Sequence, residues 1–540
     1  MESSPSASWR EHILFRQIRN LSPGGFKTEV KELSLMALPV ILANLMIFAV
    51  SFISTVFCGH LGKVELAGVA LAIAVVNVTG ISVGTGLASA CDTLISQTFG
   101  SGNLLRVGVI LQRAILIQIL ALFPCWAVLI NTESILLAVG LEQEVARLSQ
   151  LYVKIFMPAL PATFMYSLET RYLQNQGVIW PQVITGFVVN LINVLLNYIF
   201  LFALNLGVAG SALANTLSQF YMAGVLYAYI LWKGVHKATW GGWSKDCLQD
   251  WSSFIHLAIP SMVMLCVEWW TFEIGSLLAG LISEVELGAQ SVVYELSNIA
   301  FMFPSGFSVA GCVRVGNALG AGDTERAKLS AKLSFFCAGS VSVCWAVIIG
   351  SLRDHIAYVF TYDEQIRVKV GEVVLFYAPF IILDAVSAAT GGIIRGTGTQ
   401  KFGAICNVLC YYGVALPLGV PLMFAAKLGV DGLWIGFCTG VFLQCCFLVV
   451  YLVRMDWSKA TFEAQVRAGV SVNSDEPQSC QDQIHTNDPI GPEDPATVHS
   501  VDQEVAQRNV VMRRVLILAL MLLVLAAGIS ANLLVTNLVT

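Results

Sequence analysis

Long apolar segments alternate with short polar ones along most of the chain. A segment of about 20 apolar residues can cross the roughly 30 Å hydrocarbon core of a bilayer as an α-helix, the form in which backbone groups are hydrogen-bonded internally. The pattern predicts thirteen such spans: 35–57, 66–91, 105–129, 151–173, 180–204, 208–232, 254–281, 287–313, 330–350, 368–394, 402–425, 430–453 and 514–536. We therefore expect an all-α integral membrane protein.

The composition agrees with this expectation, because only 12% of the 540 residues are charged and 56% are hydrophobic. Soluble domains contain about 25% charged residues. The net charge of −5 indicates little about partners, since the depth and side of each charge matter more in a membrane protein than their sum. The fourteen cysteines show neither metal-ligand nor disulfide spacing, so we predict no metal site and no cofactor.

The distribution of basic residues predicts the orientation of the spans. Residues 1–31 are basic but lack an apolar core followed by a small-residue cleavage site, which indicates a cytoplasmic segment and not a cleaved signal peptide. With the N-terminus inside, basic residues such as Lys233, Arg314 and Arg395 gather at the cytoplasmic span ends, whereas the opposite loops contain few. Thirteen crossings then place the C-terminus outside.

An internal repeat divides the chain into two similar halves. When the sequence is shifted by 221 positions, Pro39 meets Pro260, and Val64-Glu65-Leu66 meets Val285-Glu286-Leu287. A constant offset across distant landmarks indicates a duplication. Each copy contains six spans, an even number, so the copies should be related by a pseudo-twofold axis along the membrane normal. This arrangement is typical of alternating-access transporters, although channels and some membrane enzymes are also duplicated.

The repeat and the composition predict six parts of the chain. They are a cytoplasmic N-terminal segment (1–31), a first six-helix lobe (32–235), a cytoplasmic inter-lobe loop (236–253), a second six-helix lobe (254–455), a flexible cytoplasmic linker (456–512), and a thirteenth helix with the extracellular C-terminus (513–540). The linker is acidic, polar and proline-containing, and cannot bury enough apolar surface to fold. The thirteenth helix lies outside the repeat.

Carboxylates lie deep in the spans of the second half, at Glu268, Glu273, Glu295 and Asp384. Their counterparts 221 positions earlier are uncharged: Ile47, Phe52, Ala74 and Thr163. An acid at the bilayer centre costs about 2.5–3.5 kcal/mol on insertion scales, so such groups usually face a cavity and mark an ion or proton path. We predict that they serve a task of one lobe. Pairing with Arg395, or a structural bond at the Pro260 kink, is the alternative for any single acid.

Helical geometry separates two of these acids. Five positions at roughly 100° per residue place Glu268 and Glu273 about 140° apart around the helix, so they need not share one pocket. Aromatic side chains accompany the acids: Trp269, Trp270, Tyr294, Phe303 and Tyr377. They are candidates for cation–π contact with an organic cation, and core or lipid packing is the alternative for each ring. Trp269 and Trp270 point about 100° apart, which predicts that at most one of them lines a cavity.

Two other polar segments have structural interpretations. The glycine-rich run Gly316–Asp323 lacks the Lys-Ser/Thr of a phosphate-binding loop. We interpret it as a turn in which Asp323 caps a short amphipathic helix. Asp92 lies near the cytoplasmic end of the second span and is predicted to be solvated.

Several motifs resemble those of the multidrug and toxin extrusion (MATE) family. They are VELGAQS (Val285–Ser291), VRVGNALGAGD (Val313–Asp323), and the paired elements Gln176-Gly177 and Gly398-Thr399-Gln400. The stretches CGHLGKVEL, SACDTLISQTFG, IPSMVMLCVEWW and LGVAGSALAN, with the added thirteenth helix, are similar to the mammalian branch of the family. The likeness covers residues 32–455.

The resemblance implies a secondary active antiporter that exports organic cations (drugs, toxins and cationic metabolites) in exchange for protons by alternating access. It also implies that Glu268, Glu273, Glu295 and Asp384 handle the proton and the cation, with Glu268 essential to exchange. Position 384 departs from the pattern, since some mammalian relatives have glutamate there. By the same resemblance we expect a multi-pass protein of the plasma membrane, apical in epithelia.

Other functions stay open at this point. A sodium-coupled multidrug exporter would have the same architecture. A lipid-linked sugar flippase would line its cavity with Arg and Lys for an anionic pyrophosphate, whereas the deep spans here offer acids. A membrane enzyme would need a nucleophile or a metal cluster, and we find no His-rich or paired Cys/His set, so no enzyme activity is predicted. The expected partners are small organic cations, protons and membrane lipid, without nucleic acid, and the expected state is a monomer.

Overall fold

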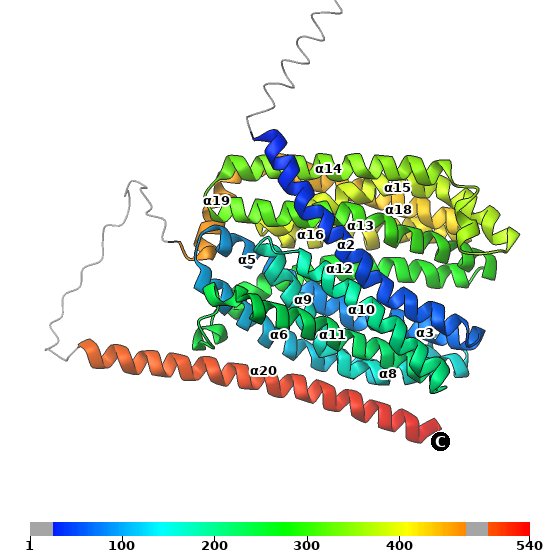
Figure 1. Ribbon diagram of the computed structural model, residues 1–540, viewed down its shortest axis with the longest axis horizontal. Helices are drawn as coiled ribbons and strands as arrows, with labels where there is room; N and C mark the ends of the chain where they lie inside the picture. Colours follow the sequence, from blue (N-terminus) through cyan, green and yellow to red (C-terminus); the bar gives the residue numbers. More distant parts are fainter. Residues whose placement is uncertain (1–24, 471–494, 540) are drawn as a thin grey trace, which may run out of the picture. The chain divides into compact units, whose positions relative to one another are not determined.

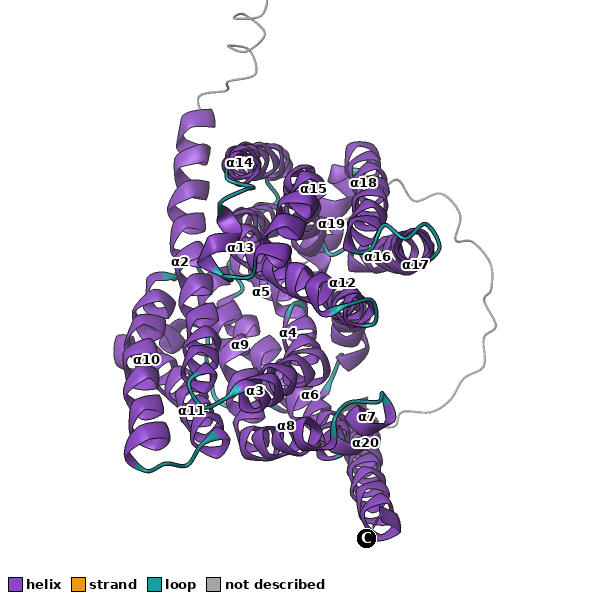
Figure 2. Cartoon of the chain, turned by 90° about the vertical axis from the view of Figure 1, so that its right-hand side faces the viewer, coloured by secondary structure: helices purple, strands orange, loops and turns teal. Residues whose placement is uncertain are grey.

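The protein is described by a computed structural model that covers residues 25–470 and 495–539. Every regular element in these residues is a helix, and Figure 2 shows helices joined by loops throughout. Long apolar runs adopt this form because a helix satisfies its backbone hydrogen bonds within one segment. The predicted all-α class is confirmed.

The helices of the first half are α2 (Phe26–Gly59), α3 (Lys63–Val76), η1 (Asn77–Ile81), α4 (Ser82–Ala88), α5 (Ala90–Gly100), α6 (Leu104–Ile130), α7 (Thr132–Ala138), α8 (Gln143–Phe156), η2 (Met157–Ala159), α9 (Leu160–Asn175), α10 (Trp180–Tyr198), η3 (Ile199–Ala203) and α11 (Val208–Lys233). Two short helices follow, η4 (Val235–Ala238) and η5 (Lys245–Leu248). The second half contains α12 (Trp251–Gly280), α13 (Glu284–Gly320), α14 (Thr324–Ser351), η6 (Ile356–Val359), α15 (Glu364–Thr397), α16 (Gln400–Asn407), η7 (Val408–Ala415), α17 (Leu416–Phe424) and α18 (Val430–Arg454). Helices α19 (Trp457–Ala468) and α20 (Pro495–Val539) complete the described chain.

Each predicted span corresponds to one of these helices or to a series of them. Twelve helical segments of the described residues are long and apolar enough to cross a membrane. The remaining predicted span, 208–232, is α11, which has 26 residues but carries polar ones such as Ser211 and Asn215, which lower its hydropathy. Both are buried, and Asn215 donates a hydrogen bond to the Tyr152 hydroxyl (2.8 Å). The polar face of α11 therefore packs against neighbouring helices.

The backbone repeats a special turn in both halves. Gly207, before α11, has a φ of +59°, and Gly429, before α18, has a φ of +61°. This left-handed region is open to glycine without the steric cost that other residues incur. The two glycines stand 222 positions apart, close to the offset of the sequence repeat.

The described residues form two compact units. Unit 1 comprises the described residues up to Ala49, with Leu173–Val188 and Val263–Thr461. Within it, α13, α14, α15 and α18 pack against one another and lie side by side in Figure 1. Its core is aromatic, with Tyr377, Phe380, Trp434 and Phe437 almost fully buried. Helices α12, α13 and α15 carry the candidate site acids.

Unit 2 comprises Val50–Tyr172, Val189–Met262 and the described residues from Phe462 onward. Within it, α3 packs on α8, α8 on α11, and α20 on α6. Asn131 at the end of α6 donates a hydrogen bond to the Gly528 carbonyl of α20 (3.0 Å). None of the membrane-length window of α20 is buried, so this helix is a peripheral addition.

The structure corrects two predictions about helix positions. Asp323 caps a helix, since its carboxylate accepts a hydrogen bond from the Arg326 N–H (3.0 Å), but that helix is the 28-residue α14 and not a short one. Residues 316–320 form the last turn of α13 instead of a loop. The predicted flexible linker was wrong at α19, where the Asp456 carboxylate caps the helix by accepting from the Ser458 N–H (3.0 Å).

Other predicted boundaries stay predictions. Residues 25–49 and 173–188 come from the first half but belong to unit 1, so the units do not follow the lobe boundaries 32–235 and 254–455. The predicted N-terminal segment up to residue 24, and residues 471–494 of the linker, lie outside the described residues. Helix α20 begins at Pro495, well before the predicted position 513.

Candidate cation-binding site

The predicted site acids all lie in unit 1, where they come from three helices. Glu268 and Glu273 are on α12, Glu295 is on α13, and Asp384 is on α15. Helices α13 and α15 pack directly against each other. The acids fall into two groups.

Glu268 and Asp384 form the first group. The two carboxylates interact electrostatically, and the guanidinium of Arg395 also acts on Glu268. Asp384 is only 8% exposed, and Arg395 donates a hydrogen bond to the Ser308 hydroxyl (3.1 Å). Neighbouring carboxylates repel each other in apolar surroundings, and a proton or a cation between them relieves the repulsion. The pair is therefore suited to exchanging one positive charge for another.

Glu273 and Glu295 form the second group, together with Tyr294. The Tyr294 hydroxyl donates a hydrogen bond to Glu273 Oε1 (3.1 Å), and Glu295 acts electrostatically on Glu273. The side chain of Asn298 lies next to Glu295, whose Oε2 is buried and accepts no hydrogen bond from the described residues. The two groups agree with the angular separation of Glu268 and Glu273 expected from helical geometry.

The predicted aromatic residues occupy different surroundings. Tyr294 is half-buried and stacks on Phe272 (ring centroids 5.9 Å apart) beside Glu273. Tyr377 is 1% exposed and lies edge-on to Trp434 (5.2 Å), in the core. Phe303 contacts Trp345 (4.7 Å), whereas Trp269 is half-buried and Trp270 is exposed. Of these rings, Tyr294 combines partial exposure with a direct bond to a site acid.

Sequence reasoning missed a buried chain of amides beside the first group. Asn407 donates to the Met264 carbonyl (3.0 Å), and Gln444 donates to Asn407 Oδ1 (2.8 Å) and to the Ser387 hydroxyl (3.0 Å). The three side chains are at most 9% exposed. Asn407 and Gln444 stand inside apolar spans, and amides in such positions commonly bond between helices. That pattern was the available signal.

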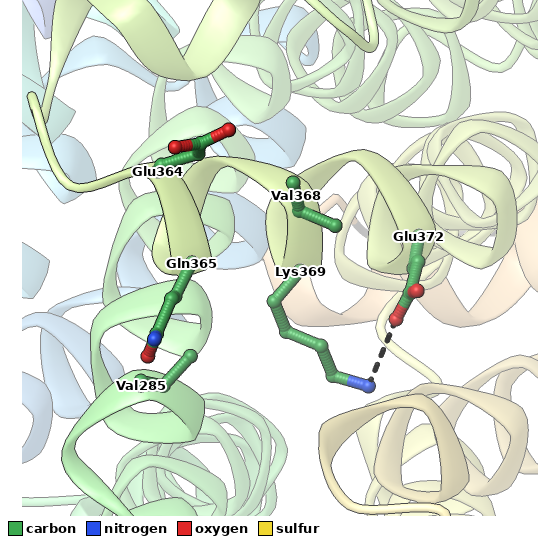
Figure 3. Close-up of a pocket in the computed structure, with 6 residues that line it drawn as sticks. All are labelled: Val285, Glu364, Gln365, Val368, Lys369 and Glu372. Atoms are coloured by element: carbon green, nitrogen blue, oxygen red, sulfur yellow. Dashed lines mark hydrogen bonds and ion pairs between the residues drawn. The ribbon is translucent and has the colours of Figure 1, made fainter.

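Two pockets lie near the start of α15, away from the acids. One, of about 370 Å³, is lined by Val285, Glu364, Gln365, Val368, Lys369 and Glu372 (Figure 3). The other, of about 300 Å³, shares Lys369 with it. The Lys369 ammonium lies 2.6 Å from Asp431 and 3.3 Å from Glu372. Fifteen residues of helix, about 22 Å, separate Lys369 from Asp384, so these pockets are not the acid site.

Unit 2 also contains membrane acids, which the sequence reasoning misjudged. Asp92 is 4% exposed and pairs with Arg171 (2.9 Å), so the prediction that it is solvated was wrong. Glu169, within the predicted span 151–173, was overlooked, and its Oε2 is buried without a hydrogen bond from the described residues. The second half is therefore distinguished by neighbouring acids and not by having all the acids.

The family model MatE matches two segments of the chain, residues 39–199 and 260–420. The second match begins and ends 221 residues after the first, so the predicted duplication is confirmed. The chain belongs to the MATE family. Its members are membrane transporters and not enzymes, as expected from the motifs.

Curated MATE proteins resemble the chain over nearly its whole length. Multidrug and toxin extrusion protein 1 of Danio rerio is 57% identical, with 96% of this chain and 92% of that protein covered. The Homo sapiens protein of the same name is 50% identical, with 95% of each chain covered. Multidrug and toxin extrusion protein 2 of Mus musculus is 55% identical, with 83% of this chain and 78% of that protein covered.

Solved structures of MATE transporters share the fold. The crystal structure of the eukaryotic MATE transporter AtDTX14 superposes with a TM-score of 0.80 at 29% identity, with 82% of this chain and all of that chain covered. The bent form of the Vibrio cholerae MATE transporter VcmN gives a TM-score of 0.69 at 16% identity, with 82% of this chain and all of that chain covered. The predicted two-lobe membrane architecture is thus confirmed at the level of fold.

Proposed function

We propose that this MATE transporter is a secondary active antiporter that exports organic cations, including drugs and toxins, in exchange for protons. Its relatives are named for multidrug and toxin extrusion, which supports a small-molecule substrate. The observation that carries the proposal is the interacting pair of half-buried Glu268 and buried Asp384, because a carboxylate pair attracts cations and can also be neutralised by protons.

In the proposed cycle, the ionised pair attracts an organic cation from the cytoplasm. After the lobes reorient, protons enter from outside, neutralise Glu268 and Asp384, and release the cation. The proton and the cation compete for the same negative charge, which couples the two fluxes. A nearly complete shift between the two states requires about 5.5 kcal/mol of differential binding.

The second group contributes recognition in this proposal. Tyr294 presents a ring and a hydroxyl next to Glu273, and Glu295 adds a further negative charge. An aromatic face beside a carboxylate attracts a flat or quaternary cation without demanding one shape. Trp269, Trp270, Phe303 and Tyr377 remain candidate aromatic contacts of the substrate in other conformations.

Transport driven by separately imposed ion gradients tests the proposal. The purified protein is reconstituted into vesicles, and uptake of a radiolabelled quaternary ammonium ion is measured under an outward proton gradient and, separately, under an outward sodium gradient. Drive by the proton gradient alone supports proton exchange. Drive by sodium alone contradicts it and establishes the sodium-coupled alternative, since carboxylate oxygens also suit hard cations. Transport of a lipid-linked sugar without cation uptake would favour a flippase.

We further propose a monomer in the plasma membrane, apical in epithelia, with a cytoplasmic N-terminus and an extracellular C-terminus. The basic residues at alternate span ends support this orientation. Epitope tags at the two termini of the protein in intact cells test it. Antibody should reach the C-terminal tag without permeabilisation and the N-terminal tag only after it.

A further inference from the structure

The buried amide chain of unit 1 consists of Asn407, Gln444 and Ser387. It links four helices at the same depth along their axes. Asn407 of α16 donates to the Met264 carbonyl of α12, and Gln444 of α18 donates to both Asn407 and the Ser387 hydroxyl of α15. The Cys445 thiol of α18 adds a bond to the Leu383 carbonyl of α15 (3.2 Å). Buried hydrogen bonds of this kind fix the axial register of helices in a membrane. Any residue one turn away is held in place by the same chain.

Three titratable residues lie one helical turn from the amide chain. Glu268 is four residues after Met264, Asp384 is three before Ser387, and Tyr411 is four after Asn407. Positions three or four apart share one face of a helix and are about 5–6 Å apart. Successive spans cross the membrane in opposite directions. Helices α12 and α16 therefore run in the same direction, and α15 runs in the opposite direction. Glu268, Asp384 and Tyr411 are therefore displaced in the same direction from the amides.

Tyr411 lies in an irregular part of its helix. It belongs to the π-helical segment η7, and such segments often occur at functional sites. Its side chain is 1% exposed, and its hydroxyl has no hydrogen-bond partner among the described residues. A buried hydroxyl without a partner is unfavourable, which indicates that it bonds to something in another state of the protein.

The titratable groups that act on Tyr411 come from α12, α15, α18 and its own segment. Glu268 of α12 and Asp384 of α15 act on it most strongly, followed by Cys445 of α18 and Cys410 of its own segment. Arg395 of α15 acts on Glu268. Of these groups, the two carboxylates are the ones that a phenol hydroxyl donates to when they are ionised.

We propose that Tyr411 is a positioning residue of the exchange site, whose hydroxyl donates to Glu268 or Asp384 whenever that carboxylate is ionised, at a level fixed by Asn407, Gln444 and Ser387. Protonation of the carboxylate removes the strongest acceptor and frees the hydroxyl. The bond thus favours the cation-binding state over the protonated state. The inference rests on the proposed proton exchange and adds a residue that sets the pH at which exchange occurs.

The pH profile of exchange by Tyr411→Phe tests this role. The phenyl ring keeps the packing but removes the donor, so the ionised carboxylates lose stabilisation and require a higher pH. We expect the half-maximal pH of exchange to rise by about one unit, a tenfold change in proton concentration. Tyr451→Phe is the matched control: this ring stacks on Phe402 (4.0 Å) near the end of α18. Its profile should match the unsubstituted protein.

Further measurements keep the outcomes distinct. An unshifted profile for Tyr411→Phe, or an equal loss at all pH values, overturns the proposal because either result is what a purely structural tyrosine would give. Gln444→Met, which breaks the amide chain, should shift the profile in the same direction. If Glu268→Gln exchanges at the full rate, the proposed function fails. If Glu268→Gln abolishes exchange while Tyr411→Phe is unchanged, only the present inference fails.

Discussion

The same helix pair is joined in two different ways in the two copies of the repeat. In the first copy, Gly186 of α10 lies so close to Met46 of α2 that an added Cβ would stand 2.6 Å from the Met46 Cβ. The position equivalent to Gly186 in the second copy is Asn407, which bonds to the Met264 carbonyl of α12. Both pairs belong to unit 1.

The first contact depends on close approach of two helices, and the second depends on a side-chain hydrogen bond. A glycine lets two helices approach closely, as is common in membrane proteins. An asparagine at the same place keeps the contact polar and connects it to Gln444 and Ser387. The second copy therefore has a hydrogen-bonded amide chain one helical turn from Glu268 and Asp384. The first copy has Ile47 and Thr163 at the positions of these two acids. Both copies thus keep a contact between the equivalent helices, and the side chains that make it differ.

The largest effect is expected at the acid itself. Glu268→Gln keeps the shape of the side chain but removes its ionisable group. The rate of exchange in vesicles should therefore fall by at least about 100-fold, which corresponds to a free-energy change of about 2.7 kcal/mol. The protein should still reach the membrane, which surface labelling checks. The control is Ile47→Gln, the same amide at the equivalent position of the first copy. If the two variants transport equally, the distinction between the copies is contradicted.

The second largest effect is expected at the hydrogen bond between Asn407 and Met264. Asn407→Leu removes the bond to Met264 and one of the two acceptors of the Gln444 amide, so we expect a loss of about 1–3 kcal/mol in stability. The melting temperature of the purified protein in detergent measures this loss. Gln465→Leu, at a polar position of α19 outside the amide chain, serves as the control. An unchanged melting temperature for Asn407→Leu would show that the amide chain does not hold the helices together.

The glycine contact of the first copy should give a loss of similar or smaller size. Gly186→Ala places a methyl group against Met46, and overpacking of this kind costs about 1–3 kcal/mol. In contrast, an added Cβ at Gly224 of α11 meets no atom within 4 Å. Gly224→Ala should therefore keep or slightly raise the melting temperature, because alanine favours the helix. Equal destabilisation by both variants would contradict close packing at Gly186.

The smallest effect is expected outside the repeat. Truncation before residue 495 removes α20, which packs on α6 in unit 2 and is exposed over its membrane-length window. Neither copy of the repeat loses a residue, so the rate of exchange per molecule in vesicles should stay unchanged. A loss of exchange with normal reconstitution would mean that the added helix participates in the cycle.

The spans and the duplication were predictable from the sequence because both depend on local signals. Apolar runs of sufficient length give the spans, and a constant offset of landmarks gives the repeat, which the two family-model matches confirm. Helix geometry also predicted that Glu268 and Glu273 lie apart. These arguments need no knowledge of which helices are neighbours.

The predictions that failed depend on contacts between distant parts of the chain. Asp92 looked solvated because its partner Arg171 is 79 positions away. Asn407 attracted no attention because its role requires Met264, on another helix. Helix α19 was missed because acidic and polar residues dominated the interpretation, although Ala460, Ala464 and Ala468 form a buried stripe at a spacing of four.

Helix α20 is far longer than a bilayer is thick. Its 45 residues extend about 68 Å, more than twice the roughly 30 Å of hydrocarbon. At the average tilt of transmembrane helices, about 20°, a helix of this length spans about 64 Å, so part of it extends beyond the headgroups.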